Sequence, residues 1–584
     1  MTATTQSTSA PAWRAAVIGA VAILAVAIGV VLGSAILQTR GTAAIGSGAS
    51  YVPATAPLYF EVRLEPSETQ DAALRELLGR FPDIEGVDLS QPLYGQLTAK
   101  LDEAIADEGT DLSWSADVEP WFDGRVGFAM LDFPQAALDP TMAPDASDTP
   151  PMVVLLGVTD RTTAEASIQR IIASADEAPT FTSQEHAGVT VQVDEESELA
   201  YALTDDQLLL APSADDIVAA LDAHASASTT LEEAGSIASL TDALPTDWLV
   251  FGIYDFTDLL ASAFEGPAAA SPGAEAMREL LADQPLRGAM ALTVGGDRVS
   301  LEVVSDPPTG ALAVTNAERG LADEAPADAL YYAEGGNVGA TLSGFIGAFK
   351  ESIAAMPDGA EQLDMAEGAL GGDVEELVSW MGDVATVAGF DGDQPWGGAI
   401  IVPTDMEQAR RTMDRLSSFA GLATLDPSIG ITVEERDVDG VEVTSLRWQD
   451  PSAPTEPDPA MPMPFAPPEL VVEWAVTDDR VLLGAGDRFV ERVLGQDAAD
   501  SLAQEPRFTD AVAELGGPDN AGVTWVDLRG IREAVLAGVG EDGAFGFDAM
   551  WGDVVPWFEP LDRIVAITRI EGDLLHSESV LLVE

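Results

Sequence analysis

The sequence of 584 residues contains no cysteine and only three histidines. Without cysteine the chain can form no disulfide, no thiolate nucleophile, no zinc-thiolate site and no lipid-modified cysteine anchor. The histidines, His186, His224 and His576, are isolated, and none belongs to an H-E-x-x-H motif. No G-x-S-x-G nucleophile elbow occurs either. The sequence therefore gives us no catalytic residue, no metal ligand and no cofactor-binding residue to name.

Positive charge is also scarce. The chain has 27 basic and 99 acidic residues, which gives a formal net charge of −72. Such a surface repels phosphate backbones and anionic headgroups, so we expect no nucleic-acid partner, and cations or basic proteins are the plausible ones. Lysine occurs only as Lys100 and Lys350. This skew fits two situations, an exported acidic protein from a GC-rich genome or adaptation to high salt.

The length and the overall composition indicate several globular domains. Apolar residues make up 47% of the chain and charged residues 22%, which is typical of folded rather than disordered protein. Domains usually hold roughly 100 to 200 residues, so 584 residues are too many for one hydrophobic core.

Residues 15–37 form the one long uncharged apolar run, AAVIGAVAILAVAIGVVLGSAIL, between Arg14 and Arg40. As a helix it would be about 35 Å long, enough to cross a hydrocarbon layer of about 30 Å. The run is longer than the apolar region of a cleaved signal peptide, and no clear A-x-A site follows it. We therefore predict a short cytoplasmic tail (1–14), an uncleaved transmembrane helix (15–37), a linker (38–50) and an extracytoplasmic body.

The body contains an internal repeat. YALTDDQLLLAPSADDIVAAL at 201–221 returns without a gap as WAVTDDRVLLGAGDRFVERVL at 474–494. Three further pairs of segments follow in the same order: 52–62 with 325–335, 155–171 with 400–416, and 251–260 with 523–531. The first of these pairs Pro53 with Pro326 and Tyr59 with Tyr331. The repeat predicts two homologous domains, 51–320 and 321–584.

Each copy is predicted to mix strands with single helices. Tyr59–Leu64 is a strand, and Ser67 with Gln70 forms a capping box for the helix that begins at Glu68. Asp160 precedes a helix from about Thr163 to Ala173, and residues 199–203 and 207–212 form a hairpin. Runs of adjacent strands with few helices indicate an α+β fold with mainly antiparallel sheet. The Pro-rich segments 134–151 and 450–468 occur in one copy each, so they are predicted to be exposed loops.

Two Asp-Asp pairs in 201–221 resemble a carboxylate site. Asp205 and Asp206 recur in the second copy, at the turn of the predicted hairpin, where short acceptors stabilise backbone bends. Asp215 and Asp216 do not recur, and they lie in the first turn of a helix capped by Ser213, where acids are favoured. We interpret both pairs as a structural turn and a helix start.

Three other motifs have a structural and a functional interpretation. Gly484-x-Gly486 resembles the start of a dinucleotide-binding turn, but the third glycine is missing. The segments 391–393 and 437–440 begin like calcium loops without the later ligands, so acidic turns are the simpler interpretation. Trp121, Trp380 and Trp557 stand before apolar strands and are predicted to be packing residues, a surface groove being the alternative.

The segment after the apolar run resembles the start of a known bacterial family. The matching residues are Tyr51-Val52-Pro53-Ala54, Pro66-Ser67 with Gln70, and Phe81-Pro82. They resemble the domain of unknown function 3352 family, whose members look like proteins with a single membrane anchor. The resemblance implies an exported, membrane-anchored protein and brings no catalytic or ligand-binding residue.

These observations lead to one main functional hypothesis and two alternatives. The anchor, the repeat and the lack of a catalytic constellation favour a non-enzymatic protein that binds or scaffolds other molecules in the cell envelope, on the outer side of the membrane. One alternative is a metal-dependent or carboxylate-based envelope hydrolase, for which divalent cations would be partners. The other is a carrier of an apolar ligand held between sheet and helices.

Overall fold

The computed structural model describes residues 47–584 except 134–149, 175–178, 227–229, 260–277, 425–429, 450–469, 539–554 and several single or paired positions. The predicted transmembrane segment, 15–37, lies outside the described residues. Within the described part of the chain, no helix combines the length and the apolar character needed to cross a membrane. The chain divides into two compact units. Unit 1 holds residues 1–262, 286–306 and 577–584, and unit 2 holds 263–285 and 307–576.

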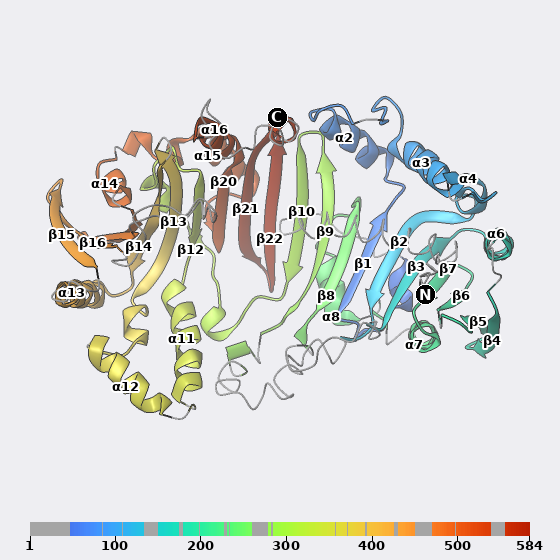
Figure 1. Cartoon of the computed structure of the whole chain (residues 1–584), viewed down its shortest axis with the longest axis horizontal. Helices are drawn as coiled ribbons and strands as arrows, with labels where there is room; N and C mark the ends of the chain where they lie inside the picture. Colours follow the sequence, from blue (N-terminus) through green and yellow to red (C-terminus); the bar gives the residue numbers. More distant parts are fainter. Residues whose placement is uncertain are drawn as a thin grey trace, which may run out of the picture. The chain divides into compact units, whose positions relative to one another are not determined.

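The described part of unit 1 contains ten strands and several helices (Figure 1). The strands are β1 (Leu58–Arg63), β2 (Phe122–Met130), β3 (Met152–Val158), β4 (Phe181–His186), β5 (Val189–Asp194), β6 (Ala200–Leu203), β7 (Gln207–Ala211), β8 (Val250–Asp255), β9 (Arg287–Gly295) and β10 (Arg298–Ser305). The helices are η1 (Ser47–Tyr51), α2 (Glu68–Leu78), α3 (Leu93–Asp107), α4 (Trp114–Asp117), α6 (Arg161–Ala173), α7 (Ala214–Ala225) and α8 (Gly235–Thr241).

Unit 2 has the same kinds of element. Its strands are β11 (Ala317–Glu318), β12 (Tyr331–Gly335), β13 (Met381–Asp391), β14 (Gln394–Pro403), β15 (Ile431–Val438), β16 (Val441–Trp448), β17 (Leu470–Val476), β18 (Val481–Ala485), β19 (Asp519–Asn520), β20 (Gly522–Asp527) and β21 (Leu561–Glu571). β22 (Leu574–Val583) begins in unit 2, and its residues from Ser577 on belong to unit 1.

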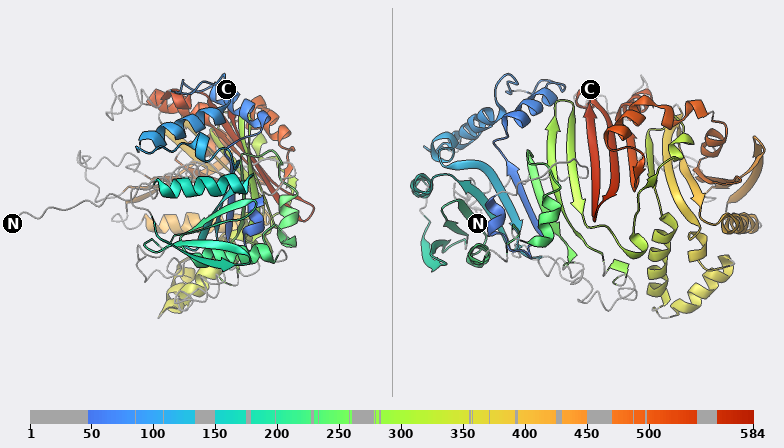
Figure 2. Two further views of the ribbon diagram at one scale, coloured as in Figure 1. Left: turned by 90° about the vertical axis from the view of Figure 1, so that its right-hand side faces the viewer. Right: turned by 180° about the vertical axis from the view of Figure 1, so that it is seen from behind.

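The helical segments of unit 2 are η4 (Gly310–Leu312), η5 (Leu321–Asp323), α11 (Val338–Ala354), α12 (Gly359–Leu370), η6 (Glu375–Leu377), α13 (Met406–Ala423), α14 (Phe489–Leu494), η8 (Ala498–Asp500), η9 (Leu502–Gln504), α15 (Pro506–Glu514) and α16 (Leu528–Gly538). Both views of Figure 2 show the yellow pair α11 and α12 extending beyond the ends of the strands of this unit.

The strands of the two units are paired in the same order. In unit 1 the order is β4-β5-β6-β7-β3-β2-β1-β8-β9-β10. In unit 2 it is β15-β16-β17-β18-β14-β13-β12-β20-β21. All of these pairings are antiparallel, so the predicted α+β class with antiparallel sheet is confirmed.

Matching local contacts accompany the matching strand order. The indole N–H of Trp121 donates to a main-chain carbonyl at 2.7 Å, and that of Trp380 does the same at 2.7 Å. The hydroxyl of Thr159 donates to the carbonyl of Trp121, as that of Thr404 does to the carbonyl of Trp380, each at 3.0 Å. Each tryptophan is almost fully buried in the cluster beneath α6 or α13, so the packing interpretation is confirmed for both.

The start of each unit is fixed in the same way. Pro53 forms an isolated bridge with Thr230, and Pro326 forms one with Ser501. Ser67 caps α2 by accepting from the main-chain N–H of Gln70, as predicted. The other half of the capping box is wrong, because the Gln70 side chain instead bonds the main-chain N–H and C=O of Val294 in β9.

Candidate interaction surface

The Asp-Asp pairs of 201–221 take the structural places predicted for them. Thr204 closes the β6–β7 turn, accepting from the N–H of Gln207 at 2.9 Å, and Asp206 accepts from the hydroxyl of Tyr51 at 2.6 Å. Asp205 forms an exposed ion pair with Arg161. Ser213 caps α7, whose first turn contains Asp215 and Asp216. The four carboxylates therefore stabilise a hairpin turn and a helix start.

The glycine and calcium motifs are parts of strands and hairpin turns. Asp437 accepts from the N–H of Gly440 in the β15–β16 turn, where Asp439 and Gly440 have φ of 51° and 85°, typical of a two-residue hairpin loop. Gly484 lies within β18, where a Cβ would approach the Glu473 side chain to 2.7 Å. Asp391 ends β13 and pairs with Arg488 and Arg492, and the rest of 391–393 lies outside the described residues.

The histidines have separate partners. His186 contacts Asp222 at 2.6 Å, and His224 stacks on Tyr51 with ring centroids 3.9 Å apart. Within the described part of the chain, no group of three or more histidines and carboxylates is arranged to hold a metal ion. The packing interpretation is wrong for Trp557, which lies in a short helical segment before β21 and is 41% exposed.

Each unit contains a buried Tyr-x-Glu pair that was not predicted from the sequence. The hydroxyl of Tyr59 donates to Glu61 Oε2 at 2.6 Å in β1, and Tyr332 donates to Glu334 in β12. The pairing of Tyr59 with Tyr331 is therefore wrong: Tyr332 is fully buried, whereas Tyr331 is 39% exposed. The alignment at the offset of 273 positions that relates 201–221 to 474–494 would have matched both the tyrosines and the glutamates.

Each buried glutamate has a tyrosine hydrogen bond and an arginine charge nearby. Burial raises the pKa of Glu61, while the Tyr59 hydrogen bond and the charge of Arg125 oppose that rise. Burial likewise raises the pKa of Glu334, against the Tyr332 hydrogen bond and the charge of Arg319. Burial also raises the pKa of Tyr59 well above its usual value, which keeps that hydroxyl a donor. These pairs hold a buried acid in the centre of each sheet.

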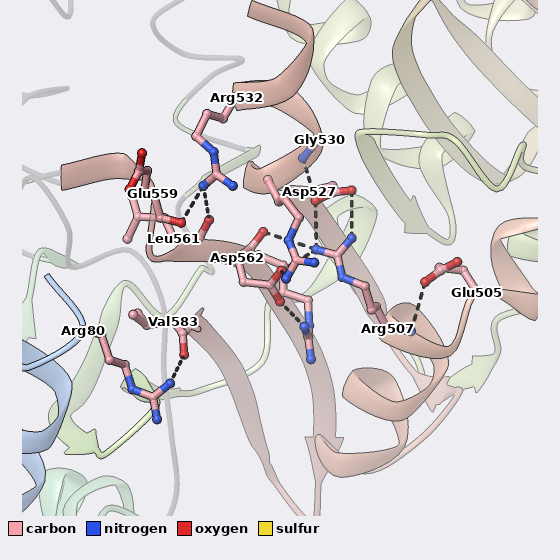
Figure 3. A network of polar contacts seen from close by, with 12 residues as sticks. Arg80, Glu505, Arg507, Asp527, Gly530, Arg532, Glu559, Leu561, Asp562 and Val583 are labelled. Carbon is pink, nitrogen blue, oxygen red and sulfur yellow. Dashed lines mark hydrogen bonds and ion pairs between the residues drawn. The ribbon is translucent and has the colours of Figure 1, made fainter. Parts of the chain in front are cut away.

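An arginine cluster closes one end of the sheet in unit 2. Asp562, whose side chain is fully buried, pairs with Arg507 at 2.6 Å, Arg529 at 2.8 Å and Arg563. Figure 3 shows Arg507 between Asp562 and Asp527, and it binds both oxygens of Asp527 at 3.0 and 3.1 Å. Three guanidinium groups and two carboxylates thus connect α15, α16, β20 and β21. This is a structural tie, because each cation already faces a carboxylate.

Exposed large apolar side chains are confined to unit 2 among the described residues. Unit 1 has none that is exposed. Those of unit 2 are Tyr331, Leu342, Phe345, Phe349, Met356, Met365, Phe390, Leu416, Phe419, Leu422, Trp448, Leu470, Val472, Val535, Leu536, Trp557 and Phe558. Contiguous exposed apolar surface marks interaction sites in soluble domains. The helical hairpin α11–α12 contributes five of these residues.

An ordinary surface helix buries its large apolar side chains, whereas α11 exposes several of them. Residues 338–349 carry no charge. The helix turns its small residues inward: Gly339 is buried, and a Cβ there would lie 2.4 Å from the carbonyl oxygen of Met381. Its large residues point outward, with Phe345 41% and Phe349 64% exposed. A helix that is apolar on most faces is normally covered by other structure, whereas this face of α11 is exposed in the described chain.

One side of α11 carries a stripe, which we define as the half-buried Val338 and the exposed Leu342, Phe345 and Phe349. Their spacing of four, three and four residues places them within one side of the helix, over about 16 Å. Val338 also lines a hollow of about 320 Å³ on the sheet, whose floor is made of Ala333, Gly335, Gly522 and Thr524 among others. The stripe and the hollow therefore meet at the first turn of α11.

The hollow exists because small residues replace large ones. In unit 1, Phe60 follows the buried Tyr59 and pairs with Phe128 on one side and Gly252 on the other. In unit 2, Ala333 follows Tyr332, and its neighbours are Thr386 and Thr524. Two phenyl rings are thus exchanged for a methyl group and a threonine side chain at the same place in the ladder.

The helical hairpin that carries the stripe is acidic. The hairpin from Val338 to Leu370 carries five acids, Glu351, Asp358, Glu361, Asp364 and Glu367, and one base, Lys350. Lys350 contacts Asp373 at 2.6 Å and Glu367 at 2.8 Å, and these hydrogen bonds raise its pKa. Its charge is therefore already compensated, and the exposed acids of the hairpin, Asp358, Glu361 and Asp364, are what we call its acidic rim.

One family profile matches residues 15–537, and its description is "Protein of unknown function (DUF3352)". The chain belongs to the DUF3352 family. The resemblance inferred from residues 51–82 is thereby confirmed, and it extends over most of the sequence. No curated protein and no solved structure matches the chain.

In this DUF3352 chain, the polar clusters and the apolar surface of the described residues differ in how far they are satisfied within the chain. The buried acids are paired with tyrosines, and the arginine cluster is occupied by its own carboxylates. The α11 stripe and the hollow, in contrast, present apolar surface and small residues without cover in the described chain. These two features form the candidate interaction surface.

Proposed function

We propose that this protein is a non-enzymatic binding or scaffolding protein of the cell envelope, and that unit 2 is its binding unit. One observation carries the proposal: the exposed large apolar residues of the described chain all lie in unit 2. Leaving them in water is unfavourable, at about 25 cal/mol per Å² of apolar surface, so a surface of this kind is maintained for contact with another molecule.

The proposal includes a membrane anchor and a duplicated body. Residues 15–37 would cross the membrane once, and the two units, which arose by internal duplication, would lie on the outer side. The shared strand order supports the duplication, and the uncharged run supports the anchor. In this arrangement unit 1 supplies a closed domain next to the linker, and unit 2 supplies the contact surface.

Photocrosslinking in intact cells tests the assignment of binding to unit 2. A photoreactive amino acid at Phe349 should give covalent adducts with another molecule, whereas the same group at Glu103 on α3, exposed in unit 1, should give few. Equal adduct yields from the two positions would contradict the proposal.

Protease treatment tests the topology separately. Protease added to spheroplasts should degrade the body while leaving only the anchor region associated with the membrane. A body that resists protease in sealed spheroplasts and is digested only after lysis would show that the proposed orientation is wrong.

A second candidate function, carriage of an apolar ligand, is favoured by the hollow of about 320 Å³. The phenyl rings of Phe60 and Phe128 fill the equivalent place in unit 1. The variant Ala333→Phe should fill the hollow from within. Native mass spectrometry should then find a bound small molecule in the wild type and none in the variant; a wild type without any bound molecule would count against this function.

A further inference from the structure

We infer that the α11 stripe binds one amphipathic helix of another protein, with apolar residues on one side and basic residues beside them. This inference rests on the proposed function and adds the chemical nature of the partner. Three features of unit 2 carry it: the spacing of the stripe, its acidic rim and the hollow at its end.

The spacing of the stripe matches what a helix presents. Val338, Leu342, Phe345 and Phe349 repeat at four, three and four residues, and recognition between two helices uses the same i, i+3, i+4 and i+7 anchors. The stripe is about 16 Å long, which corresponds to about three turns of a partner helix. Outward phenyl rings can insert between the side chains of a facing helix, as knobs do in helix packing.

The charge around the stripe selects the partner. Five carboxylates and one compensated lysine lie on the hairpin α11–α12, and Asp358, Glu361 and Asp364 are exposed. A second copy of the chain would bring the same carboxylates against them, and anionic headgroups would be repelled in the same way. Basic residues beside an apolar stripe would instead be attracted to this rim, so the charge favours a cationic helix.

The hollow gives the partner a place to anchor. Its floor holds Ala333 and Gly335, residues with little or no side chain, so an apolar side chain of the partner can contact the sheet there. Hot spots of binding energy usually form where one large side chain fills such a place. The partner helix would then run from the hollow along α11 toward Phe349.

The test uses the full chain in nanodiscs and two synthetic peptides of 18 residues. One is built from leucine and lysine with leucine at helical spacing, and the other has glutamate in place of each lysine. Binding is measured by fluorescence anisotropy at several salt concentrations. We expect the leucine–lysine peptide to bind with salt-sensitive affinity and the leucine–glutamate peptide not to bind.

Variants separate the stripe from the general negative charge of the chain. The double variant Phe345→Ser, Phe349→Ser should bind the leucine–lysine peptide at least 10-fold more weakly than the wild type. Its fold, measured by circular dichroism, should not change. Phe558→Ser, which removes an equally exposed phenyl ring of unit 2 outside the hairpin, should change affinity less than 2-fold. Asp358→Asn with Glu361→Gln and Asp364→Asn should weaken binding about 5-fold and flatten its salt dependence.

Two results would overturn the inference. If the double serine variant binds the peptide as tightly as the wild type, the attraction comes from overall charge and not from the stripe. If a photoreactive group at Phe349 attaches to lipid or to a second copy of this chain, the partner is of another class. Adducts from Phe349 together with failure of the peptide test would refute only the helical partner and leave unit 2 as the binding unit.

Discussion

Helices α2 and α11 follow β1 and β12, strands at the same place in the strand order of their units, yet they face the solvent in opposite ways. α2 has four charged residues among its eleven and buries Leu77 beneath them. α11 buries Gly339 and Ala348 and exposes Leu342, Phe345 and Phe349. Two units with the same strand order can therefore carry either a helix with its large apolar side chains buried or a helix that exposes them. The difference lies in which side chains face outward.

The ion pairs of the two units are expected to contribute unequally to stability. Asp562 of unit 2 is buried among three arginines, whereas Asp306 of unit 1 pairs with Arg287 alone and is partly exposed. Removing one partner of a buried ion pair costs about 3 to 5 kcal/mol, and an exposed pair is worth about 1 kcal/mol at most. Because the guanidinium groups reach solvent, we expect Asp562→Ala to destabilise unit 2 by about 3 kcal/mol and Asp306→Ala to destabilise unit 1 by about 1 kcal/mol. Denaturant unfolding measures both, and equal losses would contradict the comparison.

A leucine on each helix tests the opposite orientations directly. Leu77→Ala removes a buried side chain of α2 and should destabilise the protein by about 3 kcal/mol. Leu342→Ala removes a side chain of α11 that is 38% exposed and should change stability by less than about 0.5 kcal/mol. A large loss for Leu342→Ala would mean that the stripe is part of the core of unit 2.

Two glycines of α11 also test which side of this helix packs against the rest of unit 2. A Cβ at Gly339 would meet the Met381 carbonyl at 2.4 Å, so Gly339→Ala should destabilise unit 2 by about 2 kcal/mol through overpacking. A Cβ at Gly347 would find its nearest neighbour, Glu375, at 3.6 Å, so Gly347→Ala should stabilise the helix by about 0.5 kcal/mol. Thermal unfolding of the two variants should therefore shift in opposite directions, and shifts of the same sign would be inconsistent with the inward face described.

The smallest effects are expected at the buried glutamates. The pKa of Glu61 and that of Glu334 are raised by burial, so each contributes stability that is complete at low pH and is lost as the pH rises through the folded pKa. Glu61→Gln and Glu334→Gln keep the acceptor for tyrosine without the charge. Each variant should gain melting temperature relative to wild type at pH 8 more than at pH 4.5, in both units alike. The exposed Glu361→Gln is the control, and a gain that is the same at both pH values would refute the argument.

Local structure could be predicted from the sequence where backbone chemistry decides it. Ser67 and Ser213 cap helices as expected, because their short side chains can accept from main-chain N–H groups. Asp160 caps α6 in the same way, although the helix was expected only from about Thr163. The Thr204 turn also follows from its sequence. The antiparallel sheet was predictable for a similar reason, since short apolar runs joined by tight turns pair with their neighbours.

The candidate surface could not be predicted in the same way. The apolar residues of α11 read as core residues in sequence, because periodicity does not reveal which side of a helix meets the sheet. Only the close approach of Gly339 to Met381 shows that the small residues face inward. The Tyr-x-Glu pairs could have been predicted, because the pair in one unit recurs in the other at an offset of 273 positions. Matching Tyr59 with Tyr331 instead of Tyr332 concealed this recurrence.

Residues 577–584 belong to unit 1, although the whole of unit 2 precedes them in the chain. In unit 1 the N–H of Val583 donates to the carbonyl of Asp297, and Arg80 donates to the carbonyl of Val583. β10 pairs with β22, which contains residues 577–583. Because a ribosome delivers the chain from the N-terminus, this edge of β10 stays unpaired until unit 2 has been made. An open edge is a template for pairing with other chains. One strand edge therefore stays open for almost the full duration of synthesis, and deletion of residues 577–584 would leave that edge permanently exposed.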